Sequence, residues 1–286
     1  MKISNVHLIT FGGGNFEYRR SARRLAIQAE SSGLFKTVTK VTDKTFRSYC
    51  SIAWQQHQDF MVSSEKGFGY WLWKPIIIQQ RLNEIPSNDV LVYLDAGCEL
   101  NLLNEEPRDR IQYYFNLARQ HGSLAMQLRE MSEKGIFPTE SRYSKAALIS
   151  SLRPSVKTLT ENQLMATMMM FQNNNTNQVF LKKWLELAVS CNYTLLTDDL
   201  NQVYDDGFIG HRHDQSIFSI LYKEMGNRYI LDETDWKPDW STKGAEYPIW
   251  AMRNRTGASK GVMKVPDLID RVILRLPIFR KVLKLK

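Results

Sequence analysis

Short apolar runs along the chain predict the strands of a buried sheet. Residues 90–94 are four aliphatic side chains and one tyrosine without polar alternation, which is typical of a strand covered on both faces. Residues 6–11 and 37–41 predict two earlier strands, and residues 123–127 predict a later one. The methionine-rich run 164–171 predicts a core strand rather than a cofactor-binding segment, because methionine commonly fills cores.

The segments between these runs carry helical patterns. Leu25 and Ala29 share one face of a helix predicted over residues 18–32, and Gly33 supplies its stop. Further helices are predicted over 76–82, 107–122, 180–189 and 217–225, with a short one after Lys145. The chain therefore opens as strand, turn, helix and strand, which predicts an α/β fold with a parallel sheet.

Composition is that of an ordinary globular protein. The chain has 286 residues, of which 43% are hydrophobic and 24% charged, enough to bury a full core. Its three cysteines lie far apart, which fits neither a zinc knuckle nor a disulfide-stapled secreted domain and indicates a reducing compartment. With no export leader at the N-terminus and no apolar run of about 18 residues, we expect a cytoplasmic protein.

Positive charge is concentrated at the C-terminal end. The net charge is +8, and residues 260–286 hold eight Lys or Arg and two Asp, a net +6. The remaining chain is nearly neutral, so we expect no nucleic-acid partner. Apolar residues recur at three- and four-residue steps in this basic segment, with Pro277 dividing it: Leu268, Val272, Leu276, Phe279 and Leu283.

This pattern predicts a chain in two parts, residues 1–255 as the globular domain and 256–286 as a basic amphipathic tail. Basic charge beside an apolar stripe favours a tail that lies on an anionic membrane surface, so the protein would be peripheral on the inner face of the cell membrane. The alternative is a C-terminal helix that docks on the globular body and exposes its basic face to solvent.

Three stretches of the globular part carry candidate chemistry. Asp95 ends the strand 90–94, at the rim where open α/β sheets bind ligands, and Glu99 follows four residues later. Alternatively, Asp95 caps local backbone groups in a strand-ending turn. The second stretch, residues 66–75, combines two glycines and four aromatic residues with Lys74. It is interpreted either as a shaped loop whose lysine reaches an anionic or hydroxylated ligand or as an aromatic plug on the core.

The third stretch, residues 210–216, gathers two histidines, an arginine, Asp214 and Gln215 at the start of an apolar helix. Asp214 alone would be a common helix cap. The two histidines alone would be half of a metal site. Their clustering beside an apolar helix favours a functional interpretation.

In this order the motifs Gly-Phe-Gly-Tyr-Trp-Leu-Trp-Lys-Pro (67–75), Tyr-Leu-Asp-Ala-Gly-Cys-Glu (93–99) and His-Arg-His-Asp-Gln-Ser (211–216) resemble bacterial GT-A-type glycosyltransferases of surface-polysaccharide (capsule and O-antigen) loci. The resemblance runs from about residue 5 to about residue 235. It implies a nucleotide-diphospho-sugar fold, with a mixed central sheet between helices. The implied reaction moves a sugar, such as a hexose of the galactose type, from a nucleotide donor such as a UDP-sugar to a hydroxyl of a glycan or lipid-linked acceptor.

The resemblance also implies roles for individual residues. Asp214 would be the catalytic base if configuration inverts, or would hold donor-sugar hydroxyls if it is retained, and Asp95 would act beside it. The family's Asp-x-Asp pair holds Mn²⁺ or Mg²⁺, but here the second position is Gly97. Glu99 or a histidine of 211–213 would then complete a metal site, or Lys74 and nearby arginines would neutralise the diphosphate without metal. Expected donor-binding residues are Thr10, Phe11, Gly12, Gly69, Tyr70, Trp71, Lys74, Asp95, Gly97, Lys145, His213 and Gln215.

Two other classes of function compete with this one. A sugar-phosphate nucleotidyltransferase uses a related fold, but it begins with a glycine-rich loop that contains a basic finger, which residues 12–15 lack. A non-catalytic carbohydrate-binding or membrane-associated scaffold would leave the polar residues around Lys74, Asp95 and Asp214 without a purpose.

Overall fold

Six strands form one mixed sheet in the computed structural model, which describes residues 5–130, 135–198 and 207–261. The strand order is β2 (Thr37–Thr42), β1 (Val6–Gly12), β3 (Val90–Leu94), β6 (Leu164–Gln172), β5 (Ser123–Gln127) and β7 (Tyr229–Leu231). Only β6 runs antiparallel to its neighbours among these described strands. The carboxyl ends of the other five therefore meet at one edge.

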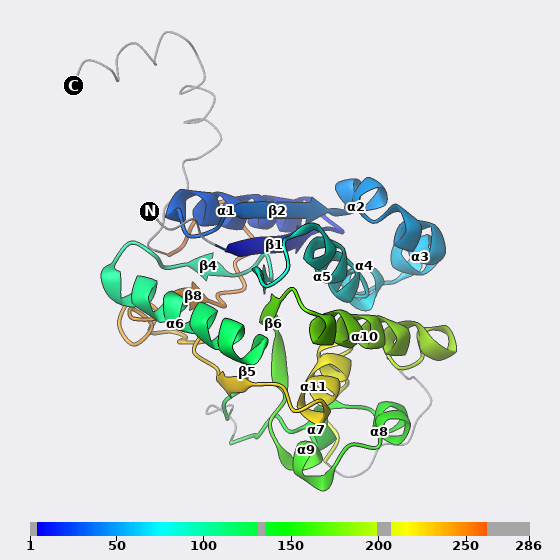
Figure 1. Cartoon of the computed structure of the whole chain (residues 1–286). Helices are drawn as coiled ribbons and strands as arrows, with labels where there is room; N and C mark the ends of the chain where they lie inside the picture. The colour runs from blue at the N-terminus through cyan, green and yellow to red at the C-terminus, as the bar shows by residue number, and fades with distance from the viewer. Residues whose placement is uncertain (1–4, 131–134, 199–206, 262–286) are drawn as a thin grey trace, which may run out of the picture.

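Helices cover both faces of the sheet (Figure 1), and the register of β3 explains why its sequence is apolar throughout. Val90, Val92 and Leu94 pack with α1 (Phe16–Ser32) and α6 (Glu105–His121) on one face. Leu91 and Tyr93 pack on the other face with α5 (Trp73–Glu84), α10 (Asn175–Tyr193) and α11 (Asp214–Glu224). The predicted α/β class, with a mixed sheet between helices, is confirmed.

The predicted helices are present, with shifted ends. Asn15 caps α1 by accepting a hydrogen bond from the Tyr18 amide, and Gly33 closes the helix in the left-handed conformation. The remaining described elements are shorter or less regular: α2 (Asp43–Tyr49), α3 (Ser51–Ser63), α4 (Gly67–Tyr70), α7 (Glu140–Tyr143), α8 (Ala146–Leu152), α9 (Val156–Thr160), β4 (Glu99–Leu100) and β8 (Ile249–Trp250).

The end of the described chain is hydrogen-bonded to the globular body. Strands β4 and β8 pair antiparallel, and the Arg24 guanidinium of α1 donates to the carbonyls of Asn254 and Thr256. Residues up to Gly261 are thus held against α1 and β4, while the predicted amphipathic stripe from Leu268 to Leu283 lies outside the described residues. In the described part of the chain, no helix has both the length and the apolar character needed to cross a bilayer.

Gly12, which the sequence analysis assigned to binding of the nucleotide-sugar donor, has a packing role between β1 and α1. A Cβ on this residue would lie 2.2 Å from the Tyr18 carbonyl oxygen and 2.6 Å from the Ala22 Cβ, both in α1. The glycine therefore lets the first helix approach the end of β1.

We expect Gly12→Ala to lower the free energy of unfolding by about 2–3 kcal/mol, because α1 must move away from β1. Gly210→Ala is the matched control, since a Cβ there meets nothing within 4 Å, and it should change stability by less than about 0.5 kcal/mol. Urea denaturation of both variants measures this. Equal midpoints for the two variants would contradict the packing explanation.

Candidate functional site

Three elements bring their charged residues together at the carboxyl edge of the sheet. Asp95 follows the last residue of β3, Lys74 lies in the first turn of α5, and Asp214 is the first residue of α11. The Lys74 Nζ lies 2.7 Å from Oδ2 of Asp214 and 3.5 Å from Oδ1 of Asp95. The structure thus joins three residues from the three separate motifs in one ion-paired triad.

Lys74 lies inside the fold, with its side chain 4% exposed. Its Nζ also donates to the Ala166 carbonyl of β6 at 3.0 Å, and it lies 5.7 Å and 5.4 Å from the ring centres of Trp73 and Tyr93. Burial alone would lower the pKa of Lys74, but the two carboxylates raise it, so the ammonium stays charged. The positive charge of Lys74 therefore acts on Asp95 and Asp214, the two carboxylates with which it is paired.

The two carboxylates of the triad differ in exposure. The Asp95 side chain is 36% exposed and accepts a hydrogen bond from the Tyr93 hydroxyl, whereas the Asp214 side chain is 7% exposed. Burial raises the pKa of Asp214 to about 6, although the charge of Lys74 opposes this shift. The site therefore combines one carboxylate open to solvent with one sheltered carboxyl group that titrates close to neutral pH, a combination suited to proton transfer.

The turn before α5 has an unusual backbone. Residues 67–71 all have positive φ, including the non-glycine residues Phe68 (51°), Tyr70 (48°) and Trp71 (63°). Each L-residue in this conformation costs about 1–2 kcal/mol, so the surrounding structure must impose it. A Cβ on Gly69 would lie 2.8 Å from the Cγ of Met61, which explains the glycine at this position.

Four of the predicted donor-binding residues lie in aromatic contacts that this turn makes. Trp71 and Tyr70 lie against His213, with ring centres 5.5 Å and 4.9 Å away, and Phe11 stacks on Trp73 at 3.9 Å. The His213 Nδ1 is 2.9 Å from the Leu196 carbonyl. The rings thus hold the start of α11 against the turn that precedes α5, while Tyr70 and Trp71 stay half-buried.

Asp198 is a candidate that the sequence reasoning missed. Its carboxylate lies 2.5 Å from the Lys66 Nζ, 3.3 Å from the Tyr70 hydroxyl and 3.8 Å from the His213 Nε2. These interactions lower the pKa of Asp198, against the opposing effect of its burial. An acid two residues after the apolar pair at 195–196 was the available signal.

Several other predicted site residues have partners inside the fold. The Lys145 side chain is fully buried, and its ammonium donates to the carbonyls of Thr194 and Thr197. Gln215 holds β6 by accepting from the Ala166 amide at 3.4 Å. Thr10 differs from these two, because it is buried on β1 and its hydroxyl has no hydrogen-bond partner among the residues that the structure describes.

Glu99 serves the fold, not the rim predicted for it. Its two carboxylate oxygens accept hydrogen bonds from the Asn254 and Ser259 side chains and from the Lys260 and Gly261 amides. These interactions lower the pKa of Glu99, against the opposing effect of its burial. The carboxylate is therefore committed to the C-terminal segment, and it is not a metal ligand beside Asp95.

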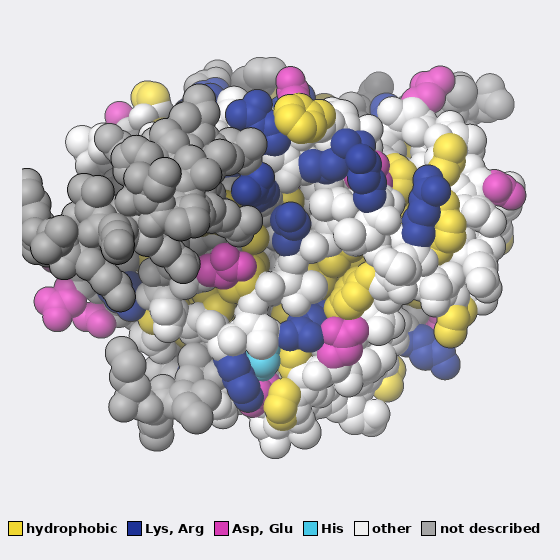
Figure 2. All heavy atoms as spheres, turned by 90° about the horizontal axis from the view of Figure 1, so that it is seen from above, with side chains coloured by type: hydrophobic (Ala, Val, Ile, Leu, Met, Phe, Trp, Pro, Cys, Tyr) yellow, Lys and Arg dark blue, Asp and Glu magenta, His cyan; other side chains and the backbone are white. Residues whose placement is uncertain are grey.

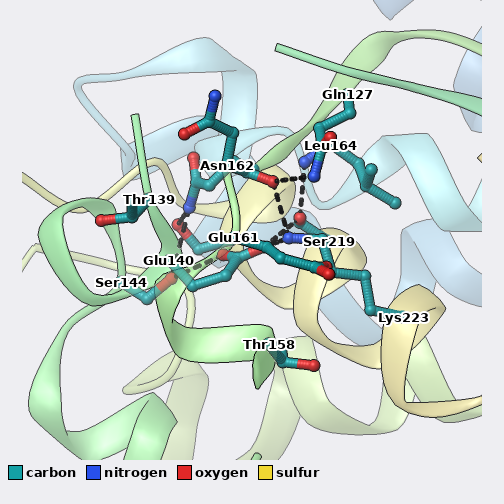
Figure 3. Close-up of polar contacts among 12 residues, drawn as sticks. Gln127, Thr139, Glu140, Ser144, Thr158, Glu161, Asn162, Leu164, Ser219 and Lys223 are labelled. Carbon is teal, nitrogen blue, oxygen red and sulfur yellow. Dashed lines mark hydrogen bonds and ion pairs between the residues drawn. The ribbon is translucent and has the colours of Figure 1, made fainter. Parts of the chain in front are cut away.

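A buried polar network holds the other end of α11 (Figure 3). The Lys223 Nζ donates to Glu140 Oε1 at 2.8 Å and to the Asn162 carbonyl at 2.7 Å, and Ser219 also donates to Glu140. The Ser219 hydroxyl in turn accepts from the Leu164 amide at 2.6 Å. This network fixes α11 to β6 and α7, and so it fixes where the helix begins, at Asp214.

Solved structures of other proteins are similar to this chain at low sequence identity. A glycosyltransferase involved in the glycosylation of the major capsid of PBCV-1 matches with 11% identity and a TM-score of 0.47, over 86% of this chain and 91% of that one. Mouse xyloside xylosyltransferase 1 matches with 10% identity and a TM-score of 0.43, over 86% and 96%. A 4-diphosphocytidyl-2C-methyl-D-erythritol synthase from Anaerococcus prevotii matches with 8% identity and a TM-score of 0.36, over 80% and 88%.

Each of these likenesses concerns the fold. No family model matches the sequence. No curated protein matches it either.

We expect Glu140→Gln to lower the free energy of unfolding by about 3–5 kcal/mol, because it leaves the buried charge of Lys223 without its partner. Glu186→Gln removes an exposed ion pair with Lys182 and should cost less than about 0.5 kcal/mol. Chemical denaturation at pH 7 compares the two. A small effect of Glu140→Gln would show that the network does not hold α11.

Proposed function

We propose that the chain is a glycosyltransferase that moves a sugar from a nucleotide-diphosphate donor to a hydroxyl group. The observation that carries this proposal is the triad of Lys74, Asp95 and Asp214, which unites the three motifs of the family resemblance at the ligand-binding edge of the sheet. Glycosyl transfer develops positive charge on the sugar and releases an anionic nucleoside diphosphate. Carboxylates and fixed cations at one edge suit both demands.

In this proposal Asp214 is the residue closest to the chemistry of proton transfer. With a pKa of about 6 it is mostly ionised at pH 7 and can accept the proton of the acceptor hydroxyl if configuration inverts. If configuration is retained, the same carboxylate holds donor-sugar hydroxyls. Asp95 faces the donor from the end of β3. Lys74 opposes the rise in the pKa of Asp214 and holds both carboxylates in place.

The donor proposed is a UDP-hexose, with the sugar in the galactose class. Its nucleotide would lie near the aromatic residues of the left-handed turn, where Tyr70 and Trp71 lie against His213 and where Phe68 stacks on Phe11. Planar rings bind bases and sugars through their faces, and half-buried rings keep one side available.

The acceptor and the place of action are proposed from the tail. A growing surface glycan of the capsule or O-antigen kind, or its lipid-linked precursor, would explain a basic amphipathic segment at the C-terminus. The enzyme would then be cytoplasmic and peripheral on the inner face of the membrane, through residues 256–286. This proposal rests on sequence alone, because residues 262–286 lie outside the described part of the chain.

A panel of UDP-hexoses, followed by release of the nucleoside diphosphate with and without simple sugar acceptors, tests the proposed function. A nucleotidyltransferase would instead need a nucleoside triphosphate and a sugar phosphate and would release pyrophosphate. A scaffold would turn over neither set of substrates.

We expect Asp214→Asn to lower kcat by about 100-fold or more, because the amide cannot accept a proton. Binding of the nucleoside diphosphate should change by less than about threefold, since Asp214 acts on a hydroxyl. Asp109→Asn, an exposed acid of α6, is the matched control. Equal losses of kcat and nucleotide affinity would assign Asp214 to the diphosphate, and an unchanged kcat would leave it a helix cap.

We expect kcat/KM to fall as the pH drops through about 6, where Asp214 gains a proton. Lys74 and Asp95 face this carboxyl group, and Tyr93 lies close to it. Lys74→Met removes the opposite charge and should move the acidic limb to higher pH by about one unit or more.

Lys66→Met, which breaks the Lys66–Asp198 pair outside the triad, should leave the acidic limb in place. If Lys74→Met lowered activity equally at every pH, Lys74 would have a purely structural role.

A further inference from the structure

A second acid at position 97 would press against the C-terminal segment. A Cβ on Gly97 would lie 3.1 Å from the Cα of Arg253, and the Asn254 amide donates to the Gly97 carbonyl at 2.9 Å. The C-terminal segment therefore runs directly against the turn that follows Asp95. A side chain at position 97 would therefore press on this backbone.

The remaining carboxylates near the turn have other partners. Both oxygens of Glu99 bind residues 254–261, and Asp95 is paired with Lys74 and Tyr93. Among the described residues, no group of three or more His, Cys, Asp and Glu side chains could hold a metal ion. Mg²⁺ and Mn²⁺ favour sites rich in oxygen ligands, so the donor set at this turn does not fit the divalent cation that the resemblance implies.

An arginine, Arg253, has its backbone beside Gly97, the position at which the family's motif has its second acid. Arg253 is exposed, and it forms no ion pair with any part of the chain that the structure describes. Burial lowers the pKa of Arg212, Tyr143 opposes this shift, and the charge of Arg253 adds to it. Arg212 is held in place, with its guanidinium 3.7 Å from the centre of the Tyr143 ring. Two neighbouring guanidinium groups repel each other until an anion binds between or beside them.

The placement of Arg253 is fixed by a third, buried arginine. The Arg24 guanidinium donates to the carbonyls of Ala96 and Cys98 on the turn and to the Asn254 carbonyl on the C-terminal segment. It thereby ties the turn and the segment together on either side of Gly97. Figure 2 shows Lys and Arg side chains, with some acids among them, spread over the face that is seen from above.

We propose that Arg253, with Arg212 beside it, binds the diphosphate of the nucleotide and offsets its charge in place of a metal ion. When the bond between the anomeric carbon and the phosphate oxygen breaks, its electron pair stays on the departing diphosphate. Fixed guanidinium groups stabilise this charge without reorganising. The inference rests on the proposed function, because it names how the same site holds its donor.

Calorimetric titration of the full chain with nucleoside diphosphates tests whether Arg253 binds the diphosphate without a metal ion. UDP, GDP, CDP and dTDP are each titrated into EDTA-treated protein and again with Mn²⁺ added. At least one nucleotide should bind without metal, and Arg253→Ala should weaken that binding about tenfold or more. Arg253→Lys should recover only part of the loss, because lysine lacks the bidentate fork. Arg255→Ala, an exposed arginine two residues away that lies over Tyr18, should bind as the wild type does.

The outcomes separate the two proposals. Binding that is lost in EDTA and restored by Mn²⁺ would overturn the inference and leave the glycosyltransferase proposal standing. If Arg253→Ala bound the nucleotide as tightly as the wild type, the role of Arg253 would be overturned, and the glycosyltransferase proposal would again stand. If no nucleotide binds with or without Mn²⁺, the proposed function itself is wrong. Metal-independent binding that depends on Arg253 supports both.

Discussion

The ammonium group of Lys74 is the interaction on which the candidate site depends. A charge this deeply buried persists only with its partners in place, since removal of one partner of a buried pair commonly costs about 3–5 kcal/mol. Those partners come from the end of β3, the start of α11 and the backbone of β6. The lysine therefore sets the relative positions of three elements, and through them the two carboxylates that the proposed reaction needs.

The fold was predictable where a local pattern has one physical cause. The run 90–94 is apolar at every position because both faces of β3 are buried, and the predicted strand matches the observed one. Helix α3 was missed because Met61 is its only buried residue within the described structure, which leaves no apolar stripe to detect. Segment 233–250 was missed for another reason. Its order depends on contacts between distant parts of the sequence. The guanidinium groups of Arg110 and Arg129 lie over the rings of Tyr247 and Trp236, and these two rings stack on each other.

The site was predictable in its centre but not around it. Strand ends and helix starts are visible in a sequence, so Asp95 and Asp214 could be selected, and topology then brings them together. Residue type alone does not tell whether a polar side chain faces a ligand or the fold. Glu99 and Lys145 have the chemistry of site residues, yet both are buried and satisfied by backbone and side-chain groups of the same chain. Asp198 was missed because a short apolar pair before an acid is a weak signal, and its contacts with Lys66, Tyr70 and His213 join segments that are far apart in the sequence.

The C-terminal segment changes how the motif around Asp95 should be interpreted. A glycine at position 97 looks like the loss of one acid when only the motif is considered. In the folded chain the same glycine is what allows Arg253 to approach the turn, and Arg24 and Glu99 hold that approach from two sides. A side chain at this position would begin 3.1 Å from the Arg253 Cα, so the segment would have to shift by a few tenths of an ångström to accept it. In the proposed site, the motif position that lacks its acid therefore lies beside an arginine, and the charge offered to a diphosphate is borne by the protein.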